Sequence, residues 1–327
     1  MNKFMGLILS VALFTGLLAG CAGAPAQNNS IGTPENIPAA TEAITPQPEE
    51  NAEASFPRIY KDARGKEITI DKKPERIAVT TWMITEKLLA IDAPPVAADT
   101  LAIMSEWASM KGYLDKYPIE DLGAEVNLEK LLEIKPDLIL ATTANEKIYD
   151  QLEAIAPVIV FDIGLMFGDW QISTREVARV VGEEAAAEAF IDDLMAQIAQ
   201  TKEKLSIDGK TVSFLRLWSK TIYSMGVATC AAYYDEETGL GLTMPQGWPE
   251  QIGELSLESL TEMNPDYIFI STSEDEAYMD ELGKNSVWNT LTAVKEGHVY
   301  PVDLSGLSGG ALAAKYGVQV VLDALGE

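Results

Sequence analysis

The chain carries an internal repeat of twelve residues, present at Leu128–Ile139 and again at Leu257–Ile268, 129 positions later. Leu, Glu, Leu, Glu, Pro, Asp and Ile recur at the same offsets in both copies. In each copy a segment of helical spacing runs into a Pro-Asp pair, after which the residues are apolar as in a buried strand. The separation is far longer than the roughly 20 to 50 residues of a solenoid unit. The repeat therefore predicts two lobes of similar build.

Short runs rich in β-branched and aromatic residues alternate with helical patterns from residue 57 onward. The runs that we interpret as strands are Arg76–Thr80, Asp137–Ala141, Pro157–Phe161, Thr211–Arg216, Tyr267–Ser271 and His298–Val302. Strands that are separated by helices predict βαβ units and mainly parallel sheets. We therefore expect an α/β fold with two Rossmann-like lobes, each built on a mainly parallel sheet.

A long helical pattern lies between the two sets of strands. Gly182 interrupts it, and from Glu183 to about Leu205 the sequence contains no Gly or Pro. The apolar residues of this stretch fall on one face at i, i+3, i+4 and i+7 spacing. At 1.5 Å per residue the helix is about 34 Å long, enough to join two lobes as a stiff backbone. The expected organisation is a first lobe at 57–168, a helical connector at 169–209 and a second lobe at 210–327, with a ligand cleft between the lobes.

The first 56 residues differ in composition from the rest of the chain. The apolar run Phe4–Leu18 is shorter than the about 20 residues of a membrane-spanning helix, and we interpret residues 1–20 as a signal peptide. Its end, Leu18-Ala19-Gly20-Cys21, resembles the bacterial lipobox, in which a lipidated Cys begins the mature chain. A plain secretory signal with an incidental Cys is the alternative. Residues 21–56 are rich in Ala, Pro, Thr and Glu, which predicts a solvated tether that holds the folded part at the outer face of the cell membrane.

Charge and residue counts exclude several classes of function. The chain has 24 Lys and Arg against 50 Asp and Glu, a net charge of −26, so the phosphates of a nucleic acid would be repelled. A single His, His298, and two widely separated Cys cannot build a His-rich or Cys-rich metal centre. We therefore expect no nucleic-acid partner, no cofactor and no metal held directly by the protein. Cys230, the only Cys of the folded part, is expected to be a buried apolar residue.

These features resemble the substrate-binding lipoproteins of ATP-driven importers for iron-siderophores, haem and cobalamin. The resemblance rests on the lipobox, Pro74–Val79, the two Leu-Glu…Pro-Asp segments, Ser271–Asp275 and Trp288–Tyr300. The segments Ile148–Pro157 and Ser213–Trp218 are most similar to the ferric-siderophore binders, those of the hydroxamate type especially. The resemblance implies an extracytoplasmic binding protein, monomeric, that captures a ferric siderophore and performs no chemistry. No Walker-type phosphate loop is present, so the ATPase of the importer must be a separate chain.

The resemblance also implies a partner in the membrane. In this family one Glu on each lobe docks onto Arg residues of the permease, and the matching positions are Glu129 and Glu258. Carboxylates at corresponding points of two similar lobes can engage both copies of a dimeric permease through charge-assisted bonds. The alternative is that both are ordinary carboxylates near a helix N-terminus. Glu133 and Glu262 recur as well, which leaves a second register open.

The ligand contacts in such a fold come from loops at the strand ends. The candidates for aromatic walls are Trp82, Trp107, Trp218, Trp248 and Tyr223, whereas we expect Trp170 and Trp288 to pack in the core. Arg216, at the end of a predicted strand, is the polar candidate because a guanidinium suits the oxygens around ferric iron. Simple packing is the alternative for each aromatic residue, and an ion pair within its own lobe is the alternative for Arg216.

Two departures from the family pattern bear on the identity of the ligand. Thr142–Glu146 contains no cation where many hydroxamate binders have an Arg, and Asp303–Gly310 replaces an aromatic-rich loop. Both departures argue against a standard hydroxamate ligand, and the acidic chain with Arg216 as its only prominent cation in the cleft favours a neutral or weakly charged chelate. Cobalamin and haem therefore stay as alternatives, although His298 lies in a packing signature and is a poor candidate for an axial haem ligand.

A hydrolase is a more distant alternative. Gly306–Gly310 formally matches the G-x-S-x-G motif, with Ser308 at the nucleophile position. In that motif's usual context a His follows in the chain, but the only His precedes it. We therefore expect these glycines to form a flexible loop near the cleft.

Overall fold

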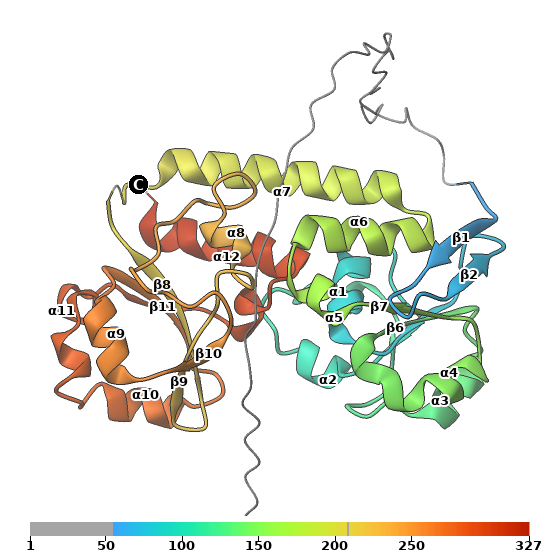
Figure 1. Ribbon diagram of the computed structural model, residues 1–327, viewed down its shortest axis with the longest axis horizontal. Coiled ribbons are helices and arrows are strands. Elements are labelled where there is room, and N and C mark those ends of the chain that lie inside the picture. Colours follow the sequence, from blue (N-terminus) through green and yellow to red (C-terminus); the bar gives the residue numbers. More distant parts are fainter. Residues whose placement is uncertain (1–54, 208, 327) are drawn as a thin grey trace, which may run out of the picture. The chain divides into compact units, whose positions relative to one another are not determined.

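The computed structural model describes residues 55–207 and 209–326, which form two α/β lobes and a long helix that joins them (Figure 1). The signal peptide, the lipidated Cys21 and nearly all of the tether that we interpret from the sequence lie outside the described residues. An antiparallel hairpin of β1 (Arg58–Lys61) and β2 (Glu67–Ile70) opens the described chain. It is fixed to the first lobe by Tyr60, which packs edge-on against Phe161 with 5.8 Å between the ring centroids.

The first lobe is built on a fully parallel five-stranded sheet of order β5-β4-β3-β6-β7. Its strands are β3 (Ile77–Val79), β4 (Ala97–Ala98), β5 (Glu120–Asp121), β6 (Leu138–Thr142) and β7 (Val158–Phe161). Its helices are α1 (Trp82–Ala90), α2 (Leu101–Met104), α3 (Leu128–Ile134), α4 (Tyr149–Glu153), α5 (Ile163–Phe167) and α6 (Trp170–Val181), with 3-10 turns η1 (Leu114–Lys116) and η2 (Thr143–Ile148). Every residue of β6 and β7 is buried, as expected for parallel strands that are covered on both faces.

The second lobe has a mixed sheet of order β10-β9-β8-β11-β12. Its strands are β8 (Val212–Trp218), β9 (Thr221–Ser224), β10 (Gly253–Leu255), β11 (Tyr267–Ser271) and β12 (Val299–Pro301). Its helices are α8 (Ala231–Tyr234), α9 (Leu257–Met263), α10 (Glu276–Leu282), α11 (Thr292–Glu296) and α12 (Ala311–Leu325), with 3-10 turns η3 (Trp288–Thr290) and η4 (Leu304–Leu307). The strands β8, β11 and β12 are parallel, as the sequence predicts, and β9 and β10 add an antiparallel edge.

The connecting helix α7 (Glu184–Lys204) agrees with the helical stretch predicted from the sequence. It has 21 residues, which makes it about 31 Å long, and Figure 1 shows it running along both lobes. The buried face of α7 packs into the hydrophobic cores of both lobes. Ala187 packs in the core of the first lobe, whereas Phe190, Leu194 and Ile198 pack in the core of the second. The helix is therefore anchored by apolar contacts at both ends, which suits it to hold the lobes apart at a fixed distance.

The internal repeat corresponds to one structural unit that occurs in each lobe. The helices α3 and α9 end in residues with left-handed backbone, Lys135 at φ 51° and Asn264 at φ 44°. The Asp of each Pro-Asp pair then holds the neighbouring strand. Asp137 accepts hydrogen bonds of 2.9 Å from the backbone N–H groups of Glu75 and Arg76, just before β3. Asp266 accepts one of 2.9 Å from the backbone N–H of Thr211, just before β8. The recurring Asp therefore sets where the adjacent parallel strand begins.

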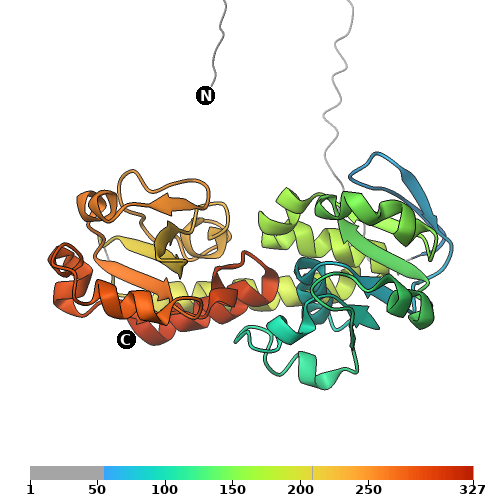
Figure 2. The same cartoon turned by 90° about the horizontal axis from the view of Figure 1, so that it is seen from below.

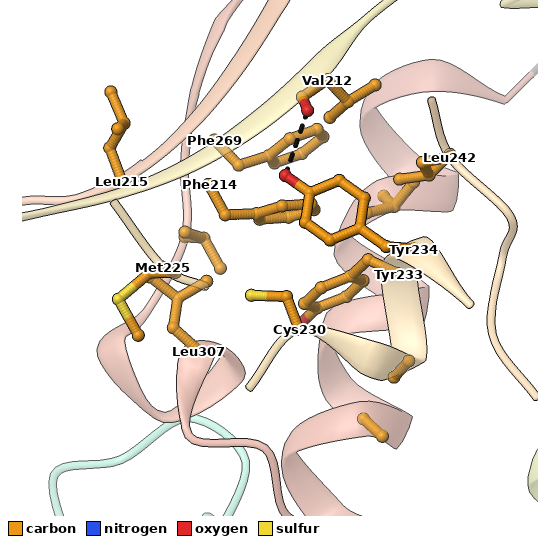
Figure 3. Close-up of a cluster of buried hydrophobic side chains, with 14 of the residues drawn as sticks. Val212, Phe214, Leu215, Met225, Cys230, Tyr233, Tyr234, Leu242, Phe269 and Leu307 are labelled. Atoms are coloured by element: carbon orange, nitrogen blue, oxygen red, sulfur yellow. Dashed lines mark hydrogen bonds between the residues drawn. The ribbon is translucent and has the colours of Figure 1, made fainter. Parts of the chain in front are cut away.

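The core of the second lobe is centred on stacked aromatic rings (Figure 3). The ring of Phe214 lies between those of Tyr233 and Phe269, at centroid distances of 4.2 and 5.2 Å. The hydroxyl of Tyr234 donates to the carbonyl of Val212 at 3.1 Å. Cys230 lies in the same cluster and is free and fully buried, which confirms the prediction from the sequence. Burial raises the pKa of its thiol, so Cys230 stays protonated and unreactive.

The two lobes meet where α1 of the first contacts the start of α12, which is red in the view of Figure 2. Glu86 of α1 is 1% exposed, and its carboxylate accepts a hydrogen bond of 2.8 Å from the backbone N–H of Ala313. Gly310 leaves the room that this carboxylate occupies, because a Cβ there would lie 1.6 Å from Oε2 of Glu86. A Cβ at Gly309 would lie 2.7 Å from the carbonyl oxygen of Phe167.

The expectation of a flexible loop at Gly306–Gly310 is therefore wrong. Most of this segment is buried and part of it forms η4, because the glycines allow close packing between the lobes. We refer below to Glu86 and the start of α12 as the interlobe joint.

Candidate functional site

An aromatic cluster lies beyond the carboxyl end of β3 in the first lobe, on the side of the second lobe. Trp82 begins α1, three residues after Val79 ends β3. Its ring packs edge-on against Trp107, with 5.0 Å between centroids, and against Phe167, with 5.8 Å. The structure thus brings together two of the predicted wall residues. It adds Phe167, at the end of the short helix α5, which was not among the residues predicted from the sequence.

Two hydrogen bonds beside Trp107 cross from one lobe to the other. The backbone N–H of Ala108 donates to Asp303 Oδ1 at 3.1 Å, and that of Ser109 donates to Ser305 Oγ at 3.1 Å. Asp303 in turn accepts hydrogen bonds from the N–H and hydroxyl of Ser305. Trp82 and Trp107 are therefore held at the junction of the lobes, and their rings are only partly buried. This is where a ligand shared by both lobes would meet aromatic surface.

A second cluster lies at the end of the β8–β9 hairpin in the other lobe. The strand register places Arg216 opposite Tyr223, and Trp218 is two residues further along β8. The guanidinium of Arg216 lies 5.5 Å from the ring centroid of Trp218, and the rings of Trp218 and Tyr223 are 6.0 Å apart. Trp218 is 48% exposed, which is unusual for so large an apolar side chain. The cluster therefore offers a solvent-facing aromatic surface with a cation behind it.

Arg216 forms an ion pair within its own lobe, which is the alternative that the sequence left open. Its guanidinium bonds both carboxylate oxygens of Glu274, with Nη2 2.8 Å from Oε1. The hydroxyl of Tyr223 donates to Glu254 at 3.3 Å. The polar groups of this cluster thus already have acidic partners.

Trp248 is a core residue rather than part of either exposed cluster. It is 6% exposed in the core of the second lobe, and its indole N–H donates to the carbonyl of Met225 at 3.0 Å. We therefore leave Trp248 out of the ligand contacts proposed below. Trp170 and Trp288 are each 2% exposed, which confirms that they are core residues.

Glu129 and Glu258 occupy equivalent positions on α3 and α9. Each is the second residue of its helix, after an N-cap side chain that accepts a backbone N–H, Asn127 in α3 and Ser256 in α9. Both side chains are exposed, and neither forms an ion pair with a described residue. In Figure 1 both helices lie below α7, one in each lobe. Glu133 and Glu262 are exposed as well, so exposure alone does not choose between the two registers.

Asp99 is a further polar residue at the carboxyl edge of the first sheet, which the sequence did not suggest because the two-residue strand β4 before it has no recognisable pattern. It is 8% exposed, and its Oδ1 has no hydrogen-bond partner among the described residues. Burial raises the pKa of Asp99 to about 7, and the neighbouring Asp121 carboxylate adds to this rise.

Neither a metal centre nor a hydrolase site is assembled in the described part of the chain. Within residues 55–207 and 209–326 no group of three or more His, Cys, Asp and Glu could hold a metal ion. The hydroxyl of Ser308 donates to the carbonyl of Ser305 at 2.8 Å. The ring of His298 instead stacks on Tyr267, at 4.5 Å, and its Nδ1 lies 3.2 Å from the carbonyl of Asp266. Among these same residues, none of the helices combines the length and apolar character needed to cross a bilayer.

Comparison with known proteins agrees with this architecture. The probable siderophore-binding lipoprotein YfiY of Bacillus subtilis is 31% identical over 293 residues, which cover 80% of this chain and 86% of that protein. The iron-uptake system-binding protein of the same bacterium is 33% identical over 253 residues, covering 73% and 78%. The crystal structure of the Bacillus subtilis triscatecholate siderophore binding protein FeuA with ferri-bacillibactin superimposes with a TM-score of 0.68 at 26% identity, covering 82% of this chain and 98% of that one.

The family described as periplasmic binding protein matches residues 77–304, a span that includes both sheets and α7. Proteins of this family bind substrates and are not enzymes, so the hydrolase alternative at Ser308 is not supported. The match confirms the resemblance inferred from the strand entry, the repeated segments and the second-lobe signatures. The chain belongs to the periplasmic binding protein family.

Proposed function

We propose that this protein is the extracytoplasmic binding component of an ATP-driven importer and that it captures a ferric siderophore between its two lobes. The observation that carries the proposal is similarity over both lobes to proteins named for siderophore binding and iron uptake. The cluster at Trp82 supports it, because partly buried aromatic rings at the lobe junction give a bulky organic chelate an apolar surface.

The two aromatic clusters form opposite walls of the proposed ligand site. Trp82 and Trp107 contact the ligand from the first lobe, and Trp218 and Tyr223 contact it from the second. Arg216 lies behind the second wall and supplies its polar contact. Each cluster is built within one lobe, so both walls contribute only when the ligand lies between them.

Delivery of the ligand involves the acidic residues of α3 and α9. Glu129 and Glu258 dock onto Arg residues of a dimeric permease, one from each lobe, while the protein acts as a monomer. Their equivalent helix positions and exposure support this assignment. A lipid anchor on Cys21 holds the protein at the outer face of the membrane, within reach of the permease.

A fluorescence titration tests the proposed ligand class. We expect a ferric trihydroxamate or a ferric triscatecholate to quench tryptophan emission with a saturable curve, because the chelate lies against the partly exposed Trp82, Trp107 and Trp218. Trp82→Phe should weaken binding and reduce the quench. Trp288→Phe, a change in the buried core, serves as the matched control and should leave the affinity unchanged. A response to cobalamin or haem with none to any ferric siderophore would replace the proposed ligand.

A further inference from the structure

The net charge of the second-lobe wall, formed by Trp218 and Tyr223, depends on which carboxylates pair with the cations beside it. Arg216 presents a fork of two N–H groups to both oxygens of Glu274, the geometry in which a guanidinium binds a carboxylate most firmly. Both side chains are about 30% exposed, at 29% for Arg216 and 31% for Glu274. The pair therefore lies at a surface that ligand can reach. Its net charge is zero, so it offers an anion no free guanidinium.

The geometry of β11 and the loop after it explains why Glu274 is available to Arg216. Ser271, the last residue of β11, is the register partner of Arg216 on β8. Glu274 follows three residues later, in the segment that leads to α10 at Glu276. The chain therefore turns back beside the guanidinium as it leaves the sheet. A carboxylate at this position neutralises the cation at the point where β8 ends.

Other polar and charged groups in and beside the β8–β9 hairpin also have carboxylates as partners. Lys220, in the β8–β9 turn, donates its backbone N–H to Asp275 and pairs through Nζ with Glu281 at 3.1 Å. Glu254 accepts from the Tyr223 hydroxyl and forms no ion pair with any residue of the described ranges. Two cations and four carboxylates therefore lie at or next to the hairpin, which leaves a net negative charge there.

A trianionic ferric complex would meet net negative charge on this wall, whereas a neutral or cationic complex would not. Like charges brought together at a binding surface strongly disfavour the wrong partner.

We infer that Glu274 is a specificity-determining residue, which neutralises Arg216 so that the site takes ferric complexes without net negative charge and disfavours strongly anionic ones. This inference rests on the proposed function and narrows its ligand class to neutral or cationic chelates of the trihydroxamate kind. Trp218 and Tyr223 supply the contact surface that such chelates need. Arg216 then acts as a hydrogen-bond donor to the ligand rather than as a counter-ion.

The test compares one charge change at the wall with the same change elsewhere. Wild type, Glu274→Gln and Arg216→Gln are titrated with a cationic ferric trihydroxamate, a neutral ferric trihydroxamate and a trianionic ferric triscatecholate, with fluorescence quenching as the readout. Glu262→Gln, an exposed carboxylate on α9, removes the same charge at a distance and is the control. The side chains of the Arg216–Glu274 pair are about 30% exposed, and ion pairs near the surface contribute little to folding, so the variants are expected to fold.

We expect wild type to bind the trihydroxamates more tightly than the triscatecholate. Glu274→Gln should raise the affinity for the triscatecholate by about tenfold to a hundredfold, and change that for the neutral complex by less than about threefold. The gain should shrink at high salt and vanish when Arg216→Gln is added, because it depends on the released guanidinium.

Equal effects of Glu274→Gln and Glu262→Gln on triscatecholate binding would overturn the inference and leave the proposed function standing. Tighter binding of the triscatecholate than of either trihydroxamate by wild type would also overturn the inference. Absence of binding to all three ferric complexes would overturn both.

Discussion

Gly310→Ala is the substitution for which the interlobe joint gives the clearest expectation. The backbone of Gly310 has φ −89° and ψ 177°, an extended conformation that alanine adopts without strain. Any penalty must therefore come from the added methyl group. Its carbon would lie 1.6 Å from Oε2 of Glu86, 2.3 Å from Cδ and 2.4 Å from Oε1, so the carboxylate has to leave its place.

The magnitude follows from what the displaced carboxylate loses. Glu86 Oε1 accepts the backbone N–H of Ala313 at 2.8 Å in a buried setting. This bond is also what caps the start of α12, and leaving a buried polar group without its partner costs about 1–3 kcal/mol. Replacing Gly by Ala offsets about 0.4–1 kcal/mol of this through the unfolded chain. We therefore expect Gly310→Ala to lower the free energy of unfolding by about 2 kcal/mol, which lowers the melting temperature by roughly 4–8 °C.

Differential scanning calorimetry of Gly310→Ala, Gly253→Ala, Glu86→Ala and the double variant Glu86→Ala/Gly310→Ala checks this prediction. Gly253→Ala is the control, because a Cβ at Gly253 meets no atom within 4 Å. In a Glu86→Ala background Gly310→Ala should no longer destabilise and should instead stabilise by about 0.4–1 kcal/mol, since no carboxylate remains to be displaced. A Gly310→Ala variant that melts within about 1 °C of Gly253→Ala, or whose effect is the same with and without Glu86, would show that displacement of the Glu86 carboxylate is not the cause.

Two further predictions concern transport and pH. The double variant Glu129→Ala/Glu258→Ala should keep the affinity for ligand but abolish uptake into cells. The control Glu133→Ala/Glu262→Ala should keep both. Uptake that survives the first double variant and is lost in the second would place the docking site one helical turn further along each helix. Asp99→Asn should stabilise the protein more at pH 8 than at pH 4. The folded pKa of Asp99, about 7, lies above its ordinary value of 3.8, so the free energy of unfolding of wild type falls as the pH rises between these values, by up to about 4 kcal/mol. Because the Asn side chain of the variant does not titrate, the difference in urea midpoint between wild type and variant should depend on pH. An equal difference at pH 4 and pH 8 would contradict the prediction.

The sequence predicted the features that depend on local pattern. The strands at residues 137–141 and 267–271 are found within a residue of their expected bounds, because a Pro-Asp pair marks the start of each and the strand itself is continuously apolar. The helix α7 was predictable because its apolar face repeats without a break. These signals come from neighbouring residues alone.

Features that depend on contacts between distant residues could not be predicted in this way. The β8–β9 hairpin turns at Ser219 and Lys220, both with positive φ, and neither is the Asn or Gly that usually marks such a turn. Trp248 stands in a loop rich in Gly and Pro, yet its indole N–H is satisfied by a carbonyl more than twenty residues away. Glu86 looks like a surface helix residue until α12, over two hundred residues later in the chain, covers it.

The interlobe joint also has a mechanical consequence. The lobes touch near α7, through Glu86 at the start of α12, whereas α3 and α9 lie below α7 in Figure 1, one on each lobe. A small force applied at these two distant helices therefore produces a large torque at the joint. Rotating the lobes apart at the joint would break the hydrogen bond between Glu86 and the start of α12, which opposes their separation. A partner that binds both helices could do the work of breaking that bond.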